Sequence, residues 1–449
     1  MRLSSDITRR RLSNCGSARA SALVLACVFL LAGTTPALAA RAEGHTWFVG
    51  QLEHANRARS QVHPNSLAAD LVDRLCDISD FTDRAYGDYL ERSLEDYEQF
   101  LPPEKLAHLI QRHRERLHET VRARLVRDLS TWIVVSGEDD FQLIEASFDG
   151  EHGKVTVAST DHRMVLHLRR RDGNWRVVDA SEDHRTLTEH FQSLVSDILD
   201  RDYSFAVLQA RLQGREDIVI EDFAQATPGT LPEGWGWRQK RDDRKAKLYR
   251  VRETANKRYL AAQDTGASVI LLKWSHWNPR TYPIMTWCWR ADVLPPGGDE
   301  RFTHTNDSAA GIYVIYSQNW LGLPRQIKYV WSTTLPEGTV DRRDMIARPY
   351  FFVLESGEAR AGEWVFEMTD VEANYQRVFG SRPKDRTLGI GLLTDANSTD
   401  SYAEAYYADI RVWSREARDE GRIADYCGDL REPANGDDGH SRITTAGEE

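Results

Sequence analysis

The sequence predicts two domains, an α+β domain followed by an all-β sandwich or jelly roll. Three observations lead to this fold class. The 449 residues exceed the size of one ordinary domain. Apolar residues recur at helical spacing up to residue 125 and then alternate with period two as far as residue 179. Beyond residue 215, short strand-like runs alternate with Gly, Pro, Asn and Asp turns, and helix signals are few.

The first 39 residues form an export signal. A basic segment precedes the apolar run 22–31, and Ala37-Leu38-Ala39 fits the small-residue cleavage pattern. The run is shorter than the roughly 20 residues that a bilayer span requires. We therefore expect a cleaved signal peptide and a periplasmic protein. A twin-arginine signal at 8–12 and a lipoprotein cysteine at Cys27 are variants of this hypothesis, and lipoprotein anchoring is the less favoured outcome.

Charge and cysteine usage exclude several classes of protein. The formal net charge of −11 argues against a general nucleic-acid binder, because phosphate contacts require clustered Lys and Arg. Cys76, Cys288 and Cys427 remain after removal of the signal, so at most one intrachain disulfide can form, and the spacing does not say which. The absence of a Cys-x-x-Cys motif argues against a zinc ribbon or a thioredoxin site.

The first domain, 40–213, begins with helices and continues as an antiparallel sheet. Helices are predicted over 65–78, 86–101 and 103–125, and strands over 132–135, 141–148, 155–158, 164–168 and 175–179. Asp172-Gly173-Asn174 predicts a tight hairpin turn before the last of these strands. Thr186 and Glu189 have the spacing of a capping box, so a closing helix is expected after residue 186. The arrangement implies helices packed on one side of a curved sheet.

This domain resembles the MlaC/Ttg2 family over residues 65–212. The resemblance is carried by Asp172-Gly173-Asn174-Trp175, the strand that ends at Asp179, and Leu187-x-x-x-Phe191. It implies an NTF2-like or MlaC-like fold. It also implies a periplasmic carrier of phospholipid or a similar amphiphile, with a membrane-bound ABC or MCE-type lipid transport complex as its partner.

Lipid carriage requires an apolar interior that the protein's own side chains leave unfilled. Each CH₂ group buried there would contribute about 0.8 kcal/mol to binding. The alternative is an ordinary filled core. The residues that we expect to line the interior are Leu71, Leu75, Tyr86, Leu90, Leu106, Ile110, Leu117, Val121, Trp132, Val134, Leu143, Val165, Val177 and Phe191.

The third helix also carries an arginine-rich face. Such a face could meet anionic lipid headgroups, or it could be an ordinary solvated surface, since Glu115 and Glu119 are interleaved with it. Its arginines are Arg112, Arg114, Arg116, Arg122, Arg124 and Arg127.

The second domain, 216–415, is rich in tryptophan and in short strands. We expect strands over 247–251, 268–274, 284–291, 311–317, 326–331, 350–354, 387–393 and 405–413. The domain resembles the DUF3047 family from about 220 to 413. The motifs that carry this resemblance are Leu231-Pro232-x-Gly234-Trp235, Trp287-x-Trp289-Arg290, Asp307-Ser308-Ala309-Ala310-Gly311-Ile312-Tyr313, Lys328-Tyr329-Val330-Trp331-Ser332, Phe379-Gly380 and Asp395-Ala396-Asn397-Ser398-Thr399.

Loop acids and aromatic rings of this domain form a candidate ligand site. Side-chain oxygens in loops can bind Ca²⁺, and exposed rings can stack on sugars. The alternative is that the acids cap turns and the rings fill the core. The candidate residues are Asp307, Tyr313, Trp331, Asp395, Asn397 and Asp409.

The sequence contains no nucleophile elbow, zinc-protease motif or phosphate-binding glycine loop, so we expect no enzyme and no cofactor other than Ca²⁺ in the second domain. Four glutamates could supply the paired carboxylates of a glycosidase, although solvated loops are the favoured interpretation: Glu355, Glu358, Glu363 and Glu367. The polar tail 416–449 is expected to be disordered.

The preferred hypothesis is a lipid carrier with a β-sandwich binding module. The alternative is an envelope protein that binds or processes glycan, with the first domain as a docking scaffold.

Overall fold

In a computed structural model of the chain, the described residues are 36–87, 89, 103–137, 139–159, 162–182, 185–201, 204–237, 248–318, 324–342 and 349–431. The chain forms two compact units. The first unit combines residues up to Asp77 with Val126–Leu187, and the second combines Ile78–Leu125 with the chain from Thr188 onward. The units therefore divide the chain differently from the predicted boundary at 213–216. None of the described helices has the length and apolarity to span a membrane.

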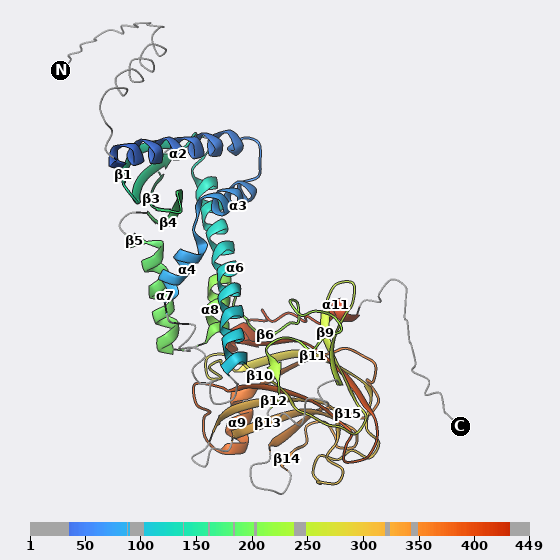
Figure 1. Cartoon of the computed structure of the whole chain (residues 1–449). Helices are drawn as coiled ribbons and strands as arrows, with labels where there is room; N and C mark the ends of the chain where they lie inside the picture. The colour runs from blue at the N-terminus through green and yellow to red at the C-terminus, as the bar shows by residue number, and fades with distance from the viewer. Residues whose placement is uncertain are drawn as a thin grey trace, which may run out of the picture. The chain divides into compact units, whose positions relative to one another are not determined.

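The first unit contains a five-stranded antiparallel meander (Figure 1). Its strands follow one another in the order of the chain: β1 (Gln142–Asp149), β2 (His152–Ser159), β3 (His162–Arg171), β4 (Asn174–Glu182) and β5 (Arg185–Thr186). Asp172 and Gly173 have φ values of 49° and 80°, which confirms the predicted tight turn between β3 and β4.

Two helices, α2 (Pro36–Arg59) and α3 (Pro64–Leu75), pack on this sheet through Phe48, Leu67 and Leu71, which share one core cluster with residues of the strands. Helix α2 was not predicted, and it begins before the proposed cleavage site at 37–39. The rest of the proposed signal, 1–35, lies outside the described residues.

The predicted strand at 132–135 is wrong, because these residues form the last turn of helix α6 (Pro103–Val135). Trp132 and Ile133 are buried whereas Val134 and Val135 are 61% and 53% exposed, a pattern that fits no strand alternation. The β-branched and aromatic composition suggested a strand, but the continuing helix overrides that propensity. The first part of α6, up to Leu125, belongs to the second unit.

The second unit contains a helical part, which precedes residue 214, and a β-sandwich. The described helices of the helical part are α4 (Ile78–Tyr86), the first part of α6, α7 (Leu187–Arg201) and α8 (Phe205–Gln213). Helix α7 begins directly after Thr186, as the capping-box spacing predicted. Most of the predicted helix 86–101 lies outside the described residues.

The sandwich confirms the predicted all-β fold of the second half. One sheet has the order β14-β15-β13-β12-β17-β10-β7, and the other has the order β16-β11-β18-β9-β8, with β6 paired to β18. The strands of the first sheet are β7 (Trp235–Gly236), β10 (Leu271–Trp274), β12 (Ser308–Gln318), β13 (Pro324–Ser332), β14 (Val340–Arg342), β15 (Tyr350–Ser356) and β17 (Gly389–Asp395). Those of the second are β6 (Ile218–Glu221), β8 (Tyr249–Glu253), β9 (Arg258–Asp264), β11 (Ile284–Val293), β16 (Val365–Asp370) and β18 (Ala403–Trp413).

All eight predicted strands of this half coincide with observed ones, and β6, β7, β9, β14 and β16 were missed. The described strand pairs are antiparallel except β13 with β15, which run parallel. Trp287, Trp289 and Trp331 are fully buried between the sheets. Helix α9 (Val371–Phe379) follows β16, starts at the side-chain cap of Asp370 and ends at Gly380, whose φ is 66°.

A disulfide between Cys288 and Cys427 fastens the C-terminal segment to the sandwich, and Cys76 is free. The segment contains the short helices α10 (Arg415–Asp419) and α11 (Gly428–Arg431). The prediction of a disordered tail from residue 416 is therefore wrong as far as residue 431, because a covalent bond and buried Leu430 hold the segment. The rest of the proposed tail, 432–449, lies outside the described residues.

Candidate functional site

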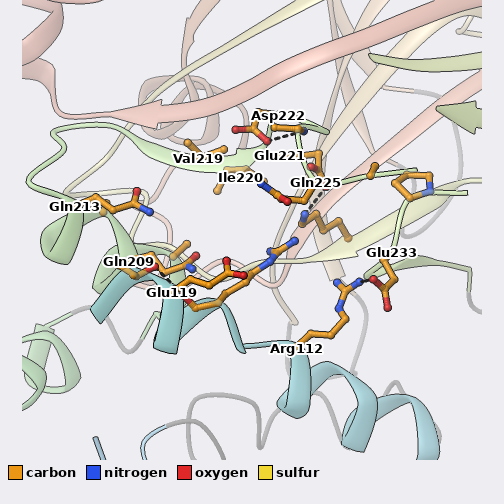
Figure 2. Close-up of a pocket in the computed structure, with 18 of the residues that line it drawn as sticks. Arg112, Glu119, Gln209, Gln213, Val219, Ile220, Glu221, Asp222, Gln225 and Glu233 are labelled. Carbon is orange, nitrogen blue, oxygen red and sulfur yellow. Dashed lines mark hydrogen bonds and ion pairs between the residues drawn. The ribbon is translucent and has the colours of Figure 1, made fainter. Parts of the chain in front are cut away.

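The second unit contains a polar cleft with a volume of about 370 Å³ (Figure 2). Its walls come from helices α6 and α8, strand β6 with the loop that follows it, and Lys273 of β10. None of the lining residues is aromatic. The charged and amide side chains that line it are Arg112, Glu115, Arg116, Glu119, Gln209, Gln213, Arg215, Asp217, Glu221, Asp222, Gln225, Glu233 and Lys273.

Helical spacing places these groups on the walls. On α6, residues 112 and 116 are four apart, as are 115 and 119, and the two pairs are offset by three residues, so all four share one face. On α8, Gln209 and Gln213 are one turn apart. This helix starts at Ser204, whose hydroxyl accepts from the amide of Val207, and ends at Gly214 with a φ of 68°. The two helices meet where the ring of His113 stacks on Phe205, with centroids 4.1 Å apart.

His113 is neutral in this packing. Burial, together with the neighbouring guanidinium groups, lowers the pKa of His113 to about 3. A neutral ring can stack on Phe205 without the cost of a buried charge, so we assign His113 a packing role rather than a role in proton transfer.

A buried ion pair forms the floor of the cleft. The Lys273 ammonium lies 2.5 Å from Glu221 Oε2, which also accepts a hydrogen bond of 2.8 Å from the indole of Trp235. The amide of Phe223 donates to Glu221 Oε1 at 2.8 Å. Burial opposes ionisation of Glu221, but Lys273 and these donors hold its pKa below the ordinary value. The floor is thus a fixed charge pair.

Several of the charges that line the cleft are paired, but not all of them. Arg112 pairs with Glu233, and Asp217 pairs with both Arg215 and Arg411. Neither Arg116 nor Glu119 has an ion-pair partner within the part of the chain that the structure describes. A cation and an anion one turn apart, next to side-chain amides, can bind a polar group that carries both charges or many hydroxyls.

The predicted lipid-lining residues divide between the two units. In the first unit, Leu71, Trp132 and Val177 belong to the core cluster, and Leu75 and Leu143 pack against it. Val165 is half-buried and lies on the face of β3 opposite to Met164 and Leu166, which join the cluster. Val134 was expected to face the interior and is exposed instead, because it lies on α6 and not on a strand.

In the second unit, Tyr86, Leu117, Val121 and Phe191 are at most 4% exposed, and Leu106 and Ile110 of α6 are half-buried. Leu90 lies outside the described residues. The Phe191 ring meets the rings of Phe81 and Tyr86 edge-on, at centroid distances of 5.3 and 6.1 Å. These positions are thus buried or half-buried on α4, α6 and α7, and their role in lipid binding stays a prediction.

The six residues of the predicted C-terminal ligand site do not form one site. Asp307 accepts hydrogen bonds from the backbone amides of Ser398 and Thr399 and from the Thr399 hydroxyl, so it caps the loop that contains Asn397. The backbone amide of Asn397 lies 3.4 Å from an oxygen of Asp395, the third residue in this region.

The other three candidates serve different purposes. Asp409 pairs with Lys257 and Arg411. Trp331 is fully buried and donates to the carbonyl of Gly357. Tyr313 is buried in a small apolar cluster. No group of three potential metal-binding side chains occurs among the described residues, so no geometry supports the Ca²⁺ hypothesis there.

Sequence reasoning missed a buried polar cluster beside Asp395. The ammonium of Lys328 donates to the Ser308 hydroxyl at 2.6 Å, and both residues are at most 3% exposed. Burial, opposed by the Lys328 charge, raises the pKa of Asp395 to about 6. Ser308 and Lys328 belong to two of the motifs that carry the DUF3047 resemblance, and this was the one sequence feature that could have indicated the cluster. Their burial assigns them to the scaffold.

Two of the four glutamates considered for glycosidase chemistry come together. Glu367 accepts from the indole of Trp289 at 3.1 Å, and Glu355 is bound by Arg360 at 2.6 Å. Burial and the Glu355 carboxylate raise the pKa of Glu367 to about 8, and a hydrogen bond links the two acids. Glycosidase carboxylates stand about 5 Å or more apart. Glu355 and Glu367 form a hydrogen-bonded pair, which lacks that separation and is consistent with one proton shared between the two carboxylates.

Comparisons with known proteins bear on both halves. Residues 234–411 match the model of the family DUF3047, described as a protein of unknown function, which confirms that resemblance of the second half. No curated protein matches the sequence significantly.

Several solved structures resemble parts of the chain. A phospholipid-binding protein from Ralstonia solanacearum is 15% identical, with coverage of 39% of this chain and 96% of its own and a TM-score of 0.29. A family 30 carbohydrate-binding module of a Clostridium thermocellum cellulosomal cellulase is 10% identical, with coverage of 44% and 98% and a TM-score of 0.25. A family 12 xyloglucanase from Bacillus licheniformis is 10% identical, with coverage of 44% and 94% and a TM-score of 0.23. At these values no function is transferred.

Proposed function

We propose that the protein is an exported carrier of phospholipid or a similar amphiphile that serves a membrane-bound ABC or MCE-type lipid transport complex of the cell envelope. The starting point is the resemblance of residues 65–212 to the MlaC/Ttg2 family. Two features of the second unit support the proposal: an apolar interior on helices α4, α6 and α7, and the polar cleft on α6 and α8.

The observation that carries the proposal is the hydroxyl of Tyr86. It is buried and has no hydrogen-bond partner among the described residues. A buried hydroxyl without a partner costs about 1–3 kcal/mol, which the ring of Phe191 next to the Tyr86 ring cannot offset by hydrogen bonding. An ester carbonyl or phosphate oxygen of an amphiphile would accept this hydrogen bond.

The buried apolar residues of α6 and α7 suit acyl chains. Leu117, Val121 and Phe191 are at most 1% exposed, so an acyl chain enters only if these side chains move apart. Each CH₂ group buried in their place would contribute about 0.8 kcal/mol, so a chain of ordinary length can offset that rearrangement.

The cleft suits the polar end of the same molecule. Arg116 can pair with a phosphate, and Glu119 can pair with an ammonium group. The charge of Arg124 acts on the Tyr86 hydroxyl. Arg116 and Arg124 are separated by about 12 Å along the axis of α6, because each residue of a helix adds about 1.5 Å. One leaflet of a bilayer core is about 15 Å thick, so a single phospholipid could span this distance.

The test is uptake of phospholipid from vesicles of phosphatidylethanolamine and phosphatidylglycerol by the delipidated full-length protein. The Tyr86→Phe variant should bind phospholipid several-fold more weakly while its lipid-free form is at least as stable as the wild type, because it no longer buries an unpaired hydroxyl. The Arg57→Ala variant, which changes an exposed arginine of α2, is the control and should behave as wild type.

Absence of uptake by the wild-type protein would overturn the proposal. Equal uptake by the wild type and Tyr86→Phe would remove the observation that carries it.

A further inference from the structure

The outward face of the six-stranded sheet carries a row of aromatic and planar polar side chains. Strand alternation explains the row. On β9, β18 and β11 the residues that point between the sheets are Leu260, Ala262, Tyr407 and Trp289, all at most 1% exposed. Their neighbours point outward. These outward residues include Arg250, Arg252, Tyr259, Gln263, Glu404, Tyr406, Arg290 and Asp292.

Glu404 organises the centre of this face. It accepts hydrogen bonds from the hydroxyls of Tyr402 and Tyr406, at 2.8 and 2.6 Å, and from the amide of Gln263 at 2.8 Å. Burial opposes ionisation of Glu404, but these donors hold its pKa below the ordinary value. The carboxylate is therefore charged and saturated with donors, and it fixes the three side chains in place.

An aromatic platform lies next to this carboxylate. The ring of Tyr259 meets Tyr406 and Trp364 nearly at right angles, with centroids 5.6 and 5.4 Å apart. Two guanidinium groups approach the Tyr406 ring, that of Arg290 at 5.4 Å and that of Arg252 at 5.9 Å. Contacts with neighbouring side chains therefore fix the positions of these rings.

The two arginines differ in their pairing. Arg290 is held by both oxygens of Asp292, at 2.5 and 2.9 Å. Arg252 is exposed, and no described carboxylate lies within ion-pair distance of it. Of the two, Arg252 is the guanidinium that can still accept an anionic partner.

A cavity of about 500 Å³ opens at this point of the sheet. Its walls include Arg250, Arg252, Glu253, Tyr259 and Gln263, so it combines one ring, one side-chain amide, two guanidinium groups and one carboxylate, which pairs with Arg258 at 3.3 Å. An aromatic face binds the apolar side of a pyranose, amides bind its hydroxyls, and arginine binds a carboxylate in bidentate fashion.

We propose that this face binds an acidic sugar, a pyranose that bears a carboxylate, within an envelope polysaccharide. The pyranose packs on Tyr259, its hydroxyls bond to Gln263, and its carboxylate pairs with Arg252. The site is independent of the lipid-carrier proposal, because none of its residues lies on helices α4, α6, α7 or α8.

The test is calorimetric titration of the full-length protein with oligogalacturonate and, in parallel, with cellohexaose, a neutral oligosaccharide. We expect binding of the acidic oligomer that weakens with added salt, and at least tenfold weaker binding of the neutral one. The Arg252→Ala variant should lose at least tenfold in affinity for oligogalacturonate, and Gln263→Ala should lose several-fold.

The matched control is Arg342→Ala. Arg342 is an exposed arginine on β14 of the other sheet that lies 5.1 Å from the ring of Tyr350, so it reproduces the cation–π contact of Arg252 away from the cavity. Its substitution should leave the affinity unchanged. Equal affinity for the two oligosaccharides, no binding of either, or equal losses in Arg252→Ala and Arg342→Ala would each overturn the proposal.

Discussion

The cleft on α6 and α8 and the outward face of the six-stranded sheet are two polar surfaces of the same unit with different chemistry. The cleft has charges of both signs on long side chains and no aromatic lining. The sheet face has rings, a donor-saturated carboxylate and an excess of arginine. Helical spacing brings flexible groups together one turn apart, whereas strand alternation lines up rigid planar ones.

The difference indicates which ligand each surface can hold. Flexible charged side chains can adapt to a mobile headgroup, and the ordering of those side chains reduces the affinity gained. Rings fixed by packing lose little entropy and select a ring-shaped ligand. The predictions below separate the two surfaces, beginning with the largest effect.

Removal of the floor of the cleft should have the largest effect. The Glu221→Ala variant leaves the Lys273 ammonium buried without its partner, and breaking a buried pair in this way costs about 3–5 kcal/mol. Chemical denaturation should show this loss. The double variant Glu221→Ala/Lys273→Met should recover most of it, and failure to recover would mean that the ion pair is not the cause.

Removal of the disulfide should affect the sheet face and spare the cleft. Cys288 lies in one cluster with Tyr406, Trp364 and Cys427, and the bond closes a separation of 139 residues. The double variant Cys288→Ser/Cys427→Ser should lose about 2–5 kcal/mol of stability and weaken oligogalacturonate binding. Thermal melts with and without reductant measure the loss. The melt of the double variant should be independent of reductant, whereas Cys76→Ser, a change at the free cysteine, should keep the reductant dependence of the wild type.

The free energy of unfolding should depend on pH through the acid pair Glu355 and Glu367 beside Trp289. The pKa of Glu367 is raised from 4.5 to about 8, so the folded state retains this proton more tightly than the unfolded state. This contribution to stability is complete below about pH 4.5 and is lost as the pH rises through 8, with a loss on the order of 3 kcal/mol between pH 4.5 and 7. The Glu367→Gln variant should flatten the unfolding free energy over this range. An unchanged slope would contradict the shared proton.

The smallest effect on stability is expected for Arg116→Ala in the cleft. Because Arg116 has no ion-pair partner among the described residues, its removal should change the unfolding free energy by less than about 0.5 kcal/mol. Phospholipid uptake should nevertheless fall several-fold, and oligogalacturonate binding should stay constant. A loss of oligogalacturonate binding in this variant would mean that the cleft and the sheet face are not separate binding sites.

The sequence predicted the fold of the second half well, because its strands follow simple alternation between turn residues. All eight predicted strands exist, and the missed ones include β14 and β7, which have only three and two residues. The parallel pairing of β13 with β15 could not be predicted, since it depends on contacts between strands that are distant in the chain. The disulfide likewise needed the fold to select Cys288 and Cys427.

The binding surfaces were harder to predict. The arginine-rich face of α6 was recognised, but nothing in the sequence joined it to Gln209 on α8 or to Glu221 on β6. The sheet face did leave a signal. Tyr402, Glu404 and Tyr406 alternate with period two at the start of β18, which places them on one side of the chain, but the predicted strand began only at residue 405. The loop acids were chosen instead, and Asp307 turned out to cap a loop.

The most direct test of the central claim is mass spectrometry of the full-length protein purified without detergent. If the protein carries an amphiphile, solvent extracts should contain about one phospholipid per chain, and the Val121→Trp variant, which fills the apolar interior of α6, should contain much less. Extracts free of phospholipid, or equal amounts in both proteins, would contradict lipid carriage.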